Sequence, residues 1–252
     1  MACVLALGAV GGGARTAQSR PQTSPGDFHA LASQLTAARD SGGEESQANE
    51  EQALQILDRG ALEQLNSAKP DLDALNARLA TFVTHQPPVG EGYRVVRLGG
   101  EPATYALLAD FGLGGPSAVR VYAGAPGSLA LAARVDRYAQ KNFFDDYMEI
   151  VPMAGPAPVF VTASGRTDDL QTGVFTAWSF TGGRVDVVWA SDILQQSSYE
   201  AAADGFRLTY CGEVDADDLR VCHAMRRDRY VWQDGAWKRA ESTAVAMTAP
   251  RP

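Results

Sequence analysis

The sequence predicts a mainly β protein, built from antiparallel meanders that form a sandwich and preceded by an α-helical hairpin. Before residue 88, apolar residues recur at intervals of three and four, which is the period of a helix with one buried face. From residue 93 onward, short runs of strand-forming residues are separated by glycine and proline. The 252 residues are 45% hydrophobic and 21% charged, which is sufficient for a hydrophobic core.

The first residues indicate an exported protein. Residues 2–10 are apolar and are followed by three glycines, as in the apolar core and cleavage region of a secretory signal. The basic residues that open such a signal are missing, so we interpret residues 1–17 as a truncated signal segment. This interpretation predicts a periplasmic or extracellular location.

Residues 18–50 are expected to hold one short helix and a flexible acidic linker. Phe28, Leu31 and Leu35 lie at helical spacing and precede a pair of glycines that would end the helix. The stretch from 41 to 51 contains almost no apolar residue, and we therefore expect it to be flexible.

Residues 51–92 are predicted to form the helical hairpin. The apolar stripe of its first helix consists of Leu54, Leu57, Ala61 and Leu65. Pro70, followed by Asp71 and Asp73, predicts the first turn of the second helix, because proline and acidic side chains suit a helix N-terminus. The stripe of the second helix consists of Leu72, Leu75, Leu79 and Phe82.

Residues 93–252 are expected to form one antiparallel β domain with three weak repeats. The predicted strands are 93–98, 105–111, 118–123 and 129–135, then 148–151, 159–163, 174–180 and 185–190, then 206–211, 220–232 and 237–240.

The repeats leave two architectures open. Each repeat closes with a hairpin, and the turns near Gly127, Gly183 and Gly235 follow one another at intervals of about fifty residues, which resembles the spacing of propeller blades. A closed propeller needs about four blades or more. We therefore favour a sandwich and keep an open or partial propeller-like arrangement of three blade-like units as the alternative.

Cys211 and Cys222 are predicted to form a disulfide. They lie in two strand-like runs joined by an acidic loop, residues 213–218, so the two sulfurs would face each other across a turn. Two unpaired core thiols are the alternative. A disulfide that closes a loop of this length would stabilise the fold by about 3 kcal/mol. Such bonds persist in the oxidising compartments to which export leads.

Charge and motifs exclude several classes of function. The formal charge of -8 and the isoelectric point near 4.9 oppose phosphate, so no nucleic-acid partner is expected. No run of 18 apolar residues predicts a transmembrane segment. Phosphate-binding glycine loops, the serine nucleophile elbow and the zinc-protease motif are absent from the sequence, so we predict neither a cofactor nor a metal site.

Tryptophans are candidates either for the core or for ligand contact. Alternation in 174–180 and 185–190 predicts that Trp178 and Trp189 line one buried face. Trp232 and Trp237 flank a turn and are expected to pair across it as a stabilising cross-strand pair. If the latter two are exposed to solvent, they become ligand-binding candidates, because aromatic rings stack on sugars.

A polar connection between two predicted strands holds the weak catalytic candidates Asp168 and Asp169. Glycoside hydrolysis requires two carboxylates about 5–10 Å apart, which neighbouring loop aspartates can provide. Arg166 in the same connection is a further ligand-binding candidate. A hydrophilic turn without function is the alternative.

These observations favour an exported, non-catalytic binding or interaction module with an unknown protein or glycan partner. A secreted glycan-directed hydrolase and a structural component of the cell envelope are the alternatives. One further hypothesis concerns the basic cluster Arg226, Arg227 and Arg229. We expect it to receive the acidic helical segment, either of the same chain or of a neighbour.

Overall fold

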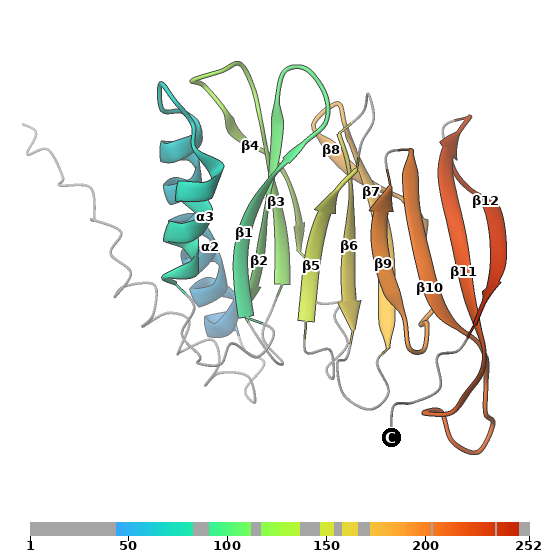
Figure 1. Ribbon diagram of the computed structural model, residues 1–252. Coiled ribbons are helices and arrows are strands. Elements are labelled where there is room, and N and C mark those ends of the chain that lie inside the picture. The colour runs from blue at the N-terminus through green and yellow to red at the C-terminus, as the bar shows by residue number, and fades with distance from the viewer. Residues whose placement is uncertain are drawn as a thin grey trace, which may run out of the picture.

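The computed structural model describes residues 44–82, 91–111, 117–136, 147–153, 158–165, 172–202, 204–234 and 236–246. Within these residues the chain forms two helices and three four-stranded antiparallel sheets (Figure 1). The predicted signal segment and the short helix that would follow it lie outside the described residues.

Each sheet consists of four strands that are consecutive in the chain. The first sheet contains β1 (Glu91–Leu98), β2 (Thr104–Phe111), β3 (Ser117–Ala123) and β4 (Ala130–Asp136). The second contains β5 (Tyr147–Pro152), β6 (Val159–Gly165), β7 (Gly173–Thr181) and β8 (Arg184–Ala190). The third contains β9 (Ser198–Ala202), β10 (Gly205–Val214), β11 (Cys222–Gln233) and β12 (Ala236–Val245).

The sheets are stacked face to face, and two helices cover the free face of the first sheet (Figure 1). Three apolar cores separate the four layers. One lies between the helices and the first sheet, one between the first and second sheets, and one between the second and third. The prediction of a mainly β protein with antiparallel sheets is confirmed, and the stacking is compatible with a sandwich-like fold.

Helix α2 (Glu44–Leu65) buries the predicted apolar stripe against the first sheet. It begins at Glu44, so the expectation of a flexible linker up to residue 51 is wrong for its last part. Glutamate, glutamine and alanine favour a helix. Glu50 and Ala53 are buried, so the helix already has a covered face near its start.

Helix α3 (Leu72–Ala80) starts two residues later than the sequence predicted from Pro70. Asp71 is the N-cap, and its side chain accepts a hydrogen bond from the Ala74 amide at 3.0 Å. Asp73 lies in the first turn, where its charge complements the helix dipole. Pro70 therefore precedes the cap instead of occupying the first helical position.

Two asparagine side chains attach the helical layer to both edges of the first sheet. The Asn76 side-chain amide donates to the Val95 carbonyl and accepts from the Val95 amide, at 2.9 and 2.8 Å, on edge strand β1. Asn66 makes the same pair of bonds with Leu129, just before the opposite edge strand β4. A carboxamide presents the same donor and acceptor as a peptide unit, so each side chain satisfies backbone groups on an outer side where the first sheet has no further strand.

A buried ionic network lies between α2 and the first sheet. Arg120 of β3 has no exposed surface and pairs with Glu51 at 3.1 Å, while its Nε lies 3.9 Å from Asp58. The Tyr122 hydroxyl donates to Asp58 at 2.7 Å. Arg134 of β4 lies 3.7 Å from Glu51 at the exposed rim of the network.

This network shows that the prediction for the basic cluster 226–229 is wrong within one chain: these arginines do not receive the acidic helix. The acidic helix is received by Arg120 and Arg134 of the first sheet, whereas residues 226–229 belong to the third sheet, at the other end of the stack. Strand periodicity does not reveal which sheet a helix covers, so the sequence could not distinguish the two basic surfaces. The version of the hypothesis that involves a neighbouring chain stays a prediction.

Replacing Asp58 by asparagine is expected to become more favourable, relative to the wild type, as the pH rises from 4 toward neutrality. Burial raises the pKa of the Asp58 carboxyl, against the opposing effects of Tyr122 and Arg120. A group whose pKa is higher in the folded state stabilises the fold below its unfolded pKa of about 4 and loses this contribution as pH rises through the folded value.

The difference in unfolding free energy between Asp58→Asn and the wild type should therefore shift in favour of the variant from pH 4 toward neutrality. Urea unfolding at a series of pH values measures this difference. A difference that does not change with pH contradicts the prediction. Glu51 is present in both proteins, so its titration largely cancels in the difference between their unfolding free energies.

The turns that join the last two strands of the first two sheets contain the predicted glycines. Gly127 has φ 80°, and the two-residue turn Gly182-Gly183 has φ 60° and 80°. Positive φ at both central residues is typical of the hairpin turn whose twist matches that of the strands, and glycine adopts it without steric cost. Gly235 lies outside the described residues, next to Asp234 with φ 51°.

Two sheet details differ from the sequence analysis. Strand β9 was missed because Ser, Glu and Ala are weak strand formers and only its pairing with β10 holds it extended. Trp178 and Trp189 do not share a face. A bulge in β8 breaks the alternation, so Trp178 lies in the second core and Trp189 packs against the third.

Candidate functional site

The β10–β11 hairpin is the most distinctive local feature of the third sheet. Strand β9 pairs with β10 only from Gly205 to Thr209, so the far part of the hairpin lacks a strand neighbour on that side. The loop that joins β10 to β11 extends beyond the rest of the sheet (Figure 1). The hairpin therefore presents a loop that is accessible from several sides.

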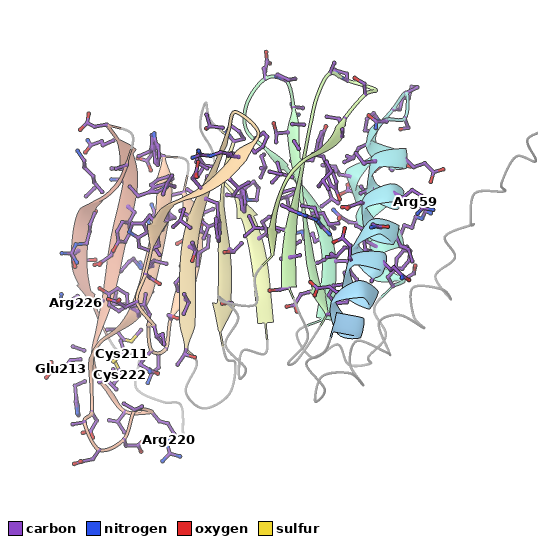
Figure 2. The ribbon with its side chains drawn as sticks, turned by 180° about the vertical axis from the view of Figure 1, so that it is seen from behind. Arg59, Cys211, Glu213, Arg220, Cys222 and Arg226 are labelled. Atoms are coloured by element: carbon purple, nitrogen blue, oxygen red, sulfur yellow. A yellow bond between two sulfur atoms is a disulfide. The ribbon has the colours of Figure 1, made fainter. Side chains whose placement is uncertain are left out.

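A disulfide closes this hairpin. Cys211 and Cys222 are bonded, with their Cα atoms 5.7 Å apart, and the bond lies at the base of the loop (Figure 2). The register shifts after Cys211, so that Val214 is opposite Cys222 and the two sulfurs can meet. The disulfide predicted from the sequence is confirmed, and the alternative of two free thiols is wrong for this structure.

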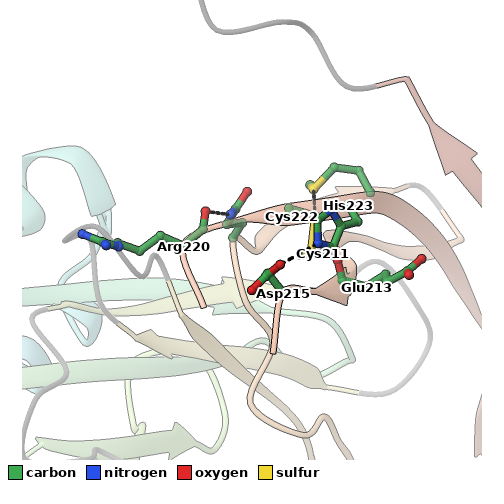
Figure 3. Close-up of a disulfide and its surroundings, with 8 residues drawn as sticks. Cys211, Glu213, Asp215, Arg220, Cys222 and His223 are labelled. Carbon is green, nitrogen blue, oxygen red and sulfur yellow. Dashed lines mark hydrogen bonds and ion pairs between the residues drawn. A yellow bond between two sulfur atoms is a disulfide. The ribbon is translucent and has the colours of Figure 1, made fainter. Parts of the chain in front are cut away.

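The loop beyond the disulfide is held by its own polar groups. Asp215 Oδ1 accepts the amides of Asp217 and Asp218 at 2.8 and 3.0 Å, and its Oδ2 lies 3.0 Å from His223 Nε2 (Figure 3). Asp218 forms two hydrogen bonds with the Arg220 guanidinium, at 2.9 and 3.0 Å. Such Asx turns fix the backbone without regular structure.

These bonds also set the electrostatics of the loop. The Asp217 amide, followed by His223, lowers the pKa of the Asp215 carboxyl, and Arg220 lowers the pKa of the Asp218 carboxyl. Both carboxylates are thereby kept in the charged form. Across the described residues, no group of three or more histidine, cysteine or acidic side chains is arranged to hold a metal ion.

Aliphatic side chains are exposed beside this polar framework. Leu219 and Val221 are 49% and 42% exposed on either side of Arg220, and Ile193 in the connection before β9 is 61% exposed. The two segments are joined, because the Gln196 side chain donates to the Arg220 carbonyl at 2.8 Å. These residues were not among the predicted site residues, although two aliphatic residues in an otherwise polar loop are a visible signal in the sequence.

The predicted tryptophan pair forms, but not as an exposed platform. Trp232 and Trp237 are opposite each other, with ring centroids 5.1 Å apart and an edge-to-face orientation. Trp237 is 7% exposed and also packs edge-on against Phe206 in the third core. The exposure on which the ligand-binding interpretation depended is therefore absent at Trp237.

The inner face of the third sheet carries one buried carboxylate. Asp228 has no exposed surface and accepts hydrogen bonds from Tyr210 at 2.9 Å and from Ser242 at 2.6 Å, and it pairs with Arg239. These partners come from β10 and β12, the two neighbours of β11. The arrangement satisfies the carboxylate and ties three strands together.

The remaining sequence-predicted site residues are not in the described part. Arg166, Asp168 and Asp169 all lie in 166–171, outside the described residues. Catalysis by loop carboxylates therefore stays a prediction.

No helix in the described part of the chain is long and apolar enough to cross a membrane. No family model, no curated protein and no solved structure matches this chain.

Proposed function

We propose that this chain is an exported, non-catalytic interaction module that binds a protein partner through the end of the β10–β11 hairpin. The observation that carries the proposal is the combination of a disulfide at the base of the loop with exposed aliphatic side chains beyond it. The stacked sheets serve as a sandwich-like scaffold that positions this loop.

The disulfide supports both parts of the proposal. A bond between cysteines persists in oxidising compartments such as the periplasm and the extracellular space. Closing the loop also reduces its conformational freedom before binding, and pre-organisation of this kind increases affinity.

The exposed side chains favour a protein over a glycan. Five large hydrophobic residues are exposed in the described residues, and three of them, Ile193, Leu219 and Val221, belong to the two joined segments at this end. Sugars are bound by flat aromatic rings, whereas aliphatic side chains surrounded by charged residues are typical of protein interfaces.

Photo-crosslinking tests the surface. A photoreactive residue at position 219 should give a discrete adduct in the native compartment, and one at the control position Leu131, exposed on β4, should not. Excess wild-type protein should reduce formation of the adduct, and excess Leu219→Ser/Val221→Ser protein should not. Equal labelling at both positions, or equal competition by the variant, would contradict the assignment of this loop as the binding surface.

Intact mass tests the compartment. Protein recovered from cells is expected to have lost its leader and to carry a mass deficit that corresponds to the oxidised Cys211–Cys222 pair. Recovery of full-length protein with two titratable thiols would overturn the proposal as a whole, whatever the crosslinking result.

A further inference from the structure

A pocket lies at the opposite end of the stack, where the α2–α3 connection meets the first sheet. It has a volume of about 140 Å³ and mostly apolar walls. Its walls come from three segments that are distant in sequence: residues 65–70, residues 103–105 and residues 124–129. A dry cavity of about 150 Å³ accepts a benzene-sized group. The pocket therefore has room for one aromatic ring.

The walls of this pocket are held in place without a ligand. Asn66 donates to the Leu129 carbonyl and accepts from its amide, which fixes the α2–α3 connection to the β3–β4 turn. Gly124, at φ 145°, brings the turn so close to its own backbone that a Cβ would lie 2.8 Å from the Ser128 carbonyl oxygen. Pre-formed walls are typical of small-molecule sites.

One polar atom in the wall lacks a partner in the part of the chain that the structure describes. Ser67 lines the pocket, and its buried Oγ has no hydrogen-bond partner among the described residues. Buried hydroxyls are nearly always hydrogen-bonded, and leaving one without a partner is costly. A ligand hydroxyl group in the pocket would satisfy it once the Ser67 side chain rotates to face the ligand.

The rim of the pocket is charged. A shallow depression of about 490 Å³ adjoins the pocket, and the two share Pro70 and Tyr105 as walls. The charged residues of this depression are Lys69, Asp71, Asp73 and Arg97. Among the described side chains, no carboxylate forms an ion pair with Lys69 or Arg97. Two cations and two carboxylates around one opening suit a ligand head group that carries both charges.

We propose that this pocket binds a free aromatic α-amino acid, with tyrosine preferred over phenylalanine. The ring occupies the apolar pocket, and the phenol hydroxyl pairs with Ser67 Oγ. The ligand carboxylate pairs with Arg97 and Lys69, and its ammonium group lies toward Asp73. The guanidinium fork of Arg97 can bind a carboxylate through two parallel hydrogen bonds. The site is separate from the hairpin surface and does not depend on it.

Calorimetric titration of the full chain tests the ligand class. L-tyrosine is expected to bind. Tyramine, which lacks the carboxylate, and 3-(4-hydroxyphenyl)propionate, which lacks the ammonium group, are expected to bind about tenfold more weakly or worse, because each removes a charge-assisted contact. Absence of tyrosine binding, or equal binding of N-acetyl-tyrosine amide, overturns the proposal.

Variants test the residues. Arg97→Gln should weaken tyrosine binding about tenfold, whereas Arg94→Gln, an exposed arginine on the same strand outside the depression, should leave it unchanged. Ser67→Ala should remove the preference for tyrosine over phenylalanine and leave phenylalanine binding unaltered. Equal effects of the two arginine variants, or a preference that survives in Ser67→Ala, would show that the pocket is not the site. Melting temperatures identify any variant that fails to fold.

Discussion

Replacing Arg120 by methionine is expected to lower the unfolding free energy by about 3–5 kcal/mol, the largest effect of any single substitution considered. Methionine has a similar length and retains the packing of the side chain against the core. The substitution removes the positive charge and leaves the buried Asp58 facing an apolar surface, while Glu51, which is 44% exposed, keeps Arg134 beside it. Breaking a buried pair by removing one partner costs more than the pair contributes, because a charge remains without compensation.

The control is Arg134→Met in the neighbouring strand. Arg134 lies near the same Glu51 carboxylate, but its side chain is 57% exposed, so its loss should cost less than about 1 kcal/mol. Urea unfolding of the two variants at neutral pH measures both values. Similar costs for the two substitutions would mean that burial does not govern this network.

A double variant separates charge from packing. Adding Asp58→Asn to Arg120→Met should recover part of the lost stability, because the carboxylate that burial disfavours is then neutral. Residues in one network couple by about 0.5–3 kcal/mol in such cycles. Strict additivity of the two substitutions would argue against direct coupling between Arg120 and Asp58.

Removal of the disulfide by Cys211→Ala/Cys222→Ala is expected to lower the unfolding free energy by about 3 kcal/mol. The two cysteines are 11 residues apart, and closing a loop of this length mainly restricts the unfolded chain. The change should appear as a lower urea midpoint. A second effect is local: the backbone amides of residues 213–221 should exchange with solvent faster, since the base of the loop is no longer closed.

Reduced wild-type protein is the matched control, because it lacks the bond but retains both side chains. Its stability should equal that of the double variant within the error of extrapolation. The prediction is contradicted if the oxidised wild type is no more stable than the reduced wild type and the double variant. A stable variant that no longer forms the crosslink at position 219 would show that the disulfide serves the shape of the loop more than the stability of the fold.

Local pattern predicted much of the fold. The apolar stripe of α2, most of the strands and the Gly182-Gly183 turn follow from period, residue preference and turn chemistry, which act over a few residues. The Cys211–Cys222 bond could be predicted for the same reason, because both cysteines belong to one hairpin.

The parts that the sequence did not reveal depend on distant neighbours. Residues 44–50 continue a helix whose buried face packs on the first sheet from Ala53 onward, and β9 is extended because β10 pairs with it. A single bulge moved Trp189 into a different core from Trp178, which no periodic pattern indicates.

Residue type and spacing alone determined that this chain is mainly antiparallel β and that one hairpin is closed by a disulfide. Only the tertiary structure decided that Arg120, instead of the arginines of β11, receives the acidic helix, and that Ser67 lines a pocket beside Arg97. The physical reason is that hydrophobic periodicity specifies which face of an element is buried. Which other element covers that face depends on how the layers stack, and the charged and polar contacts between layers follow from that stacking.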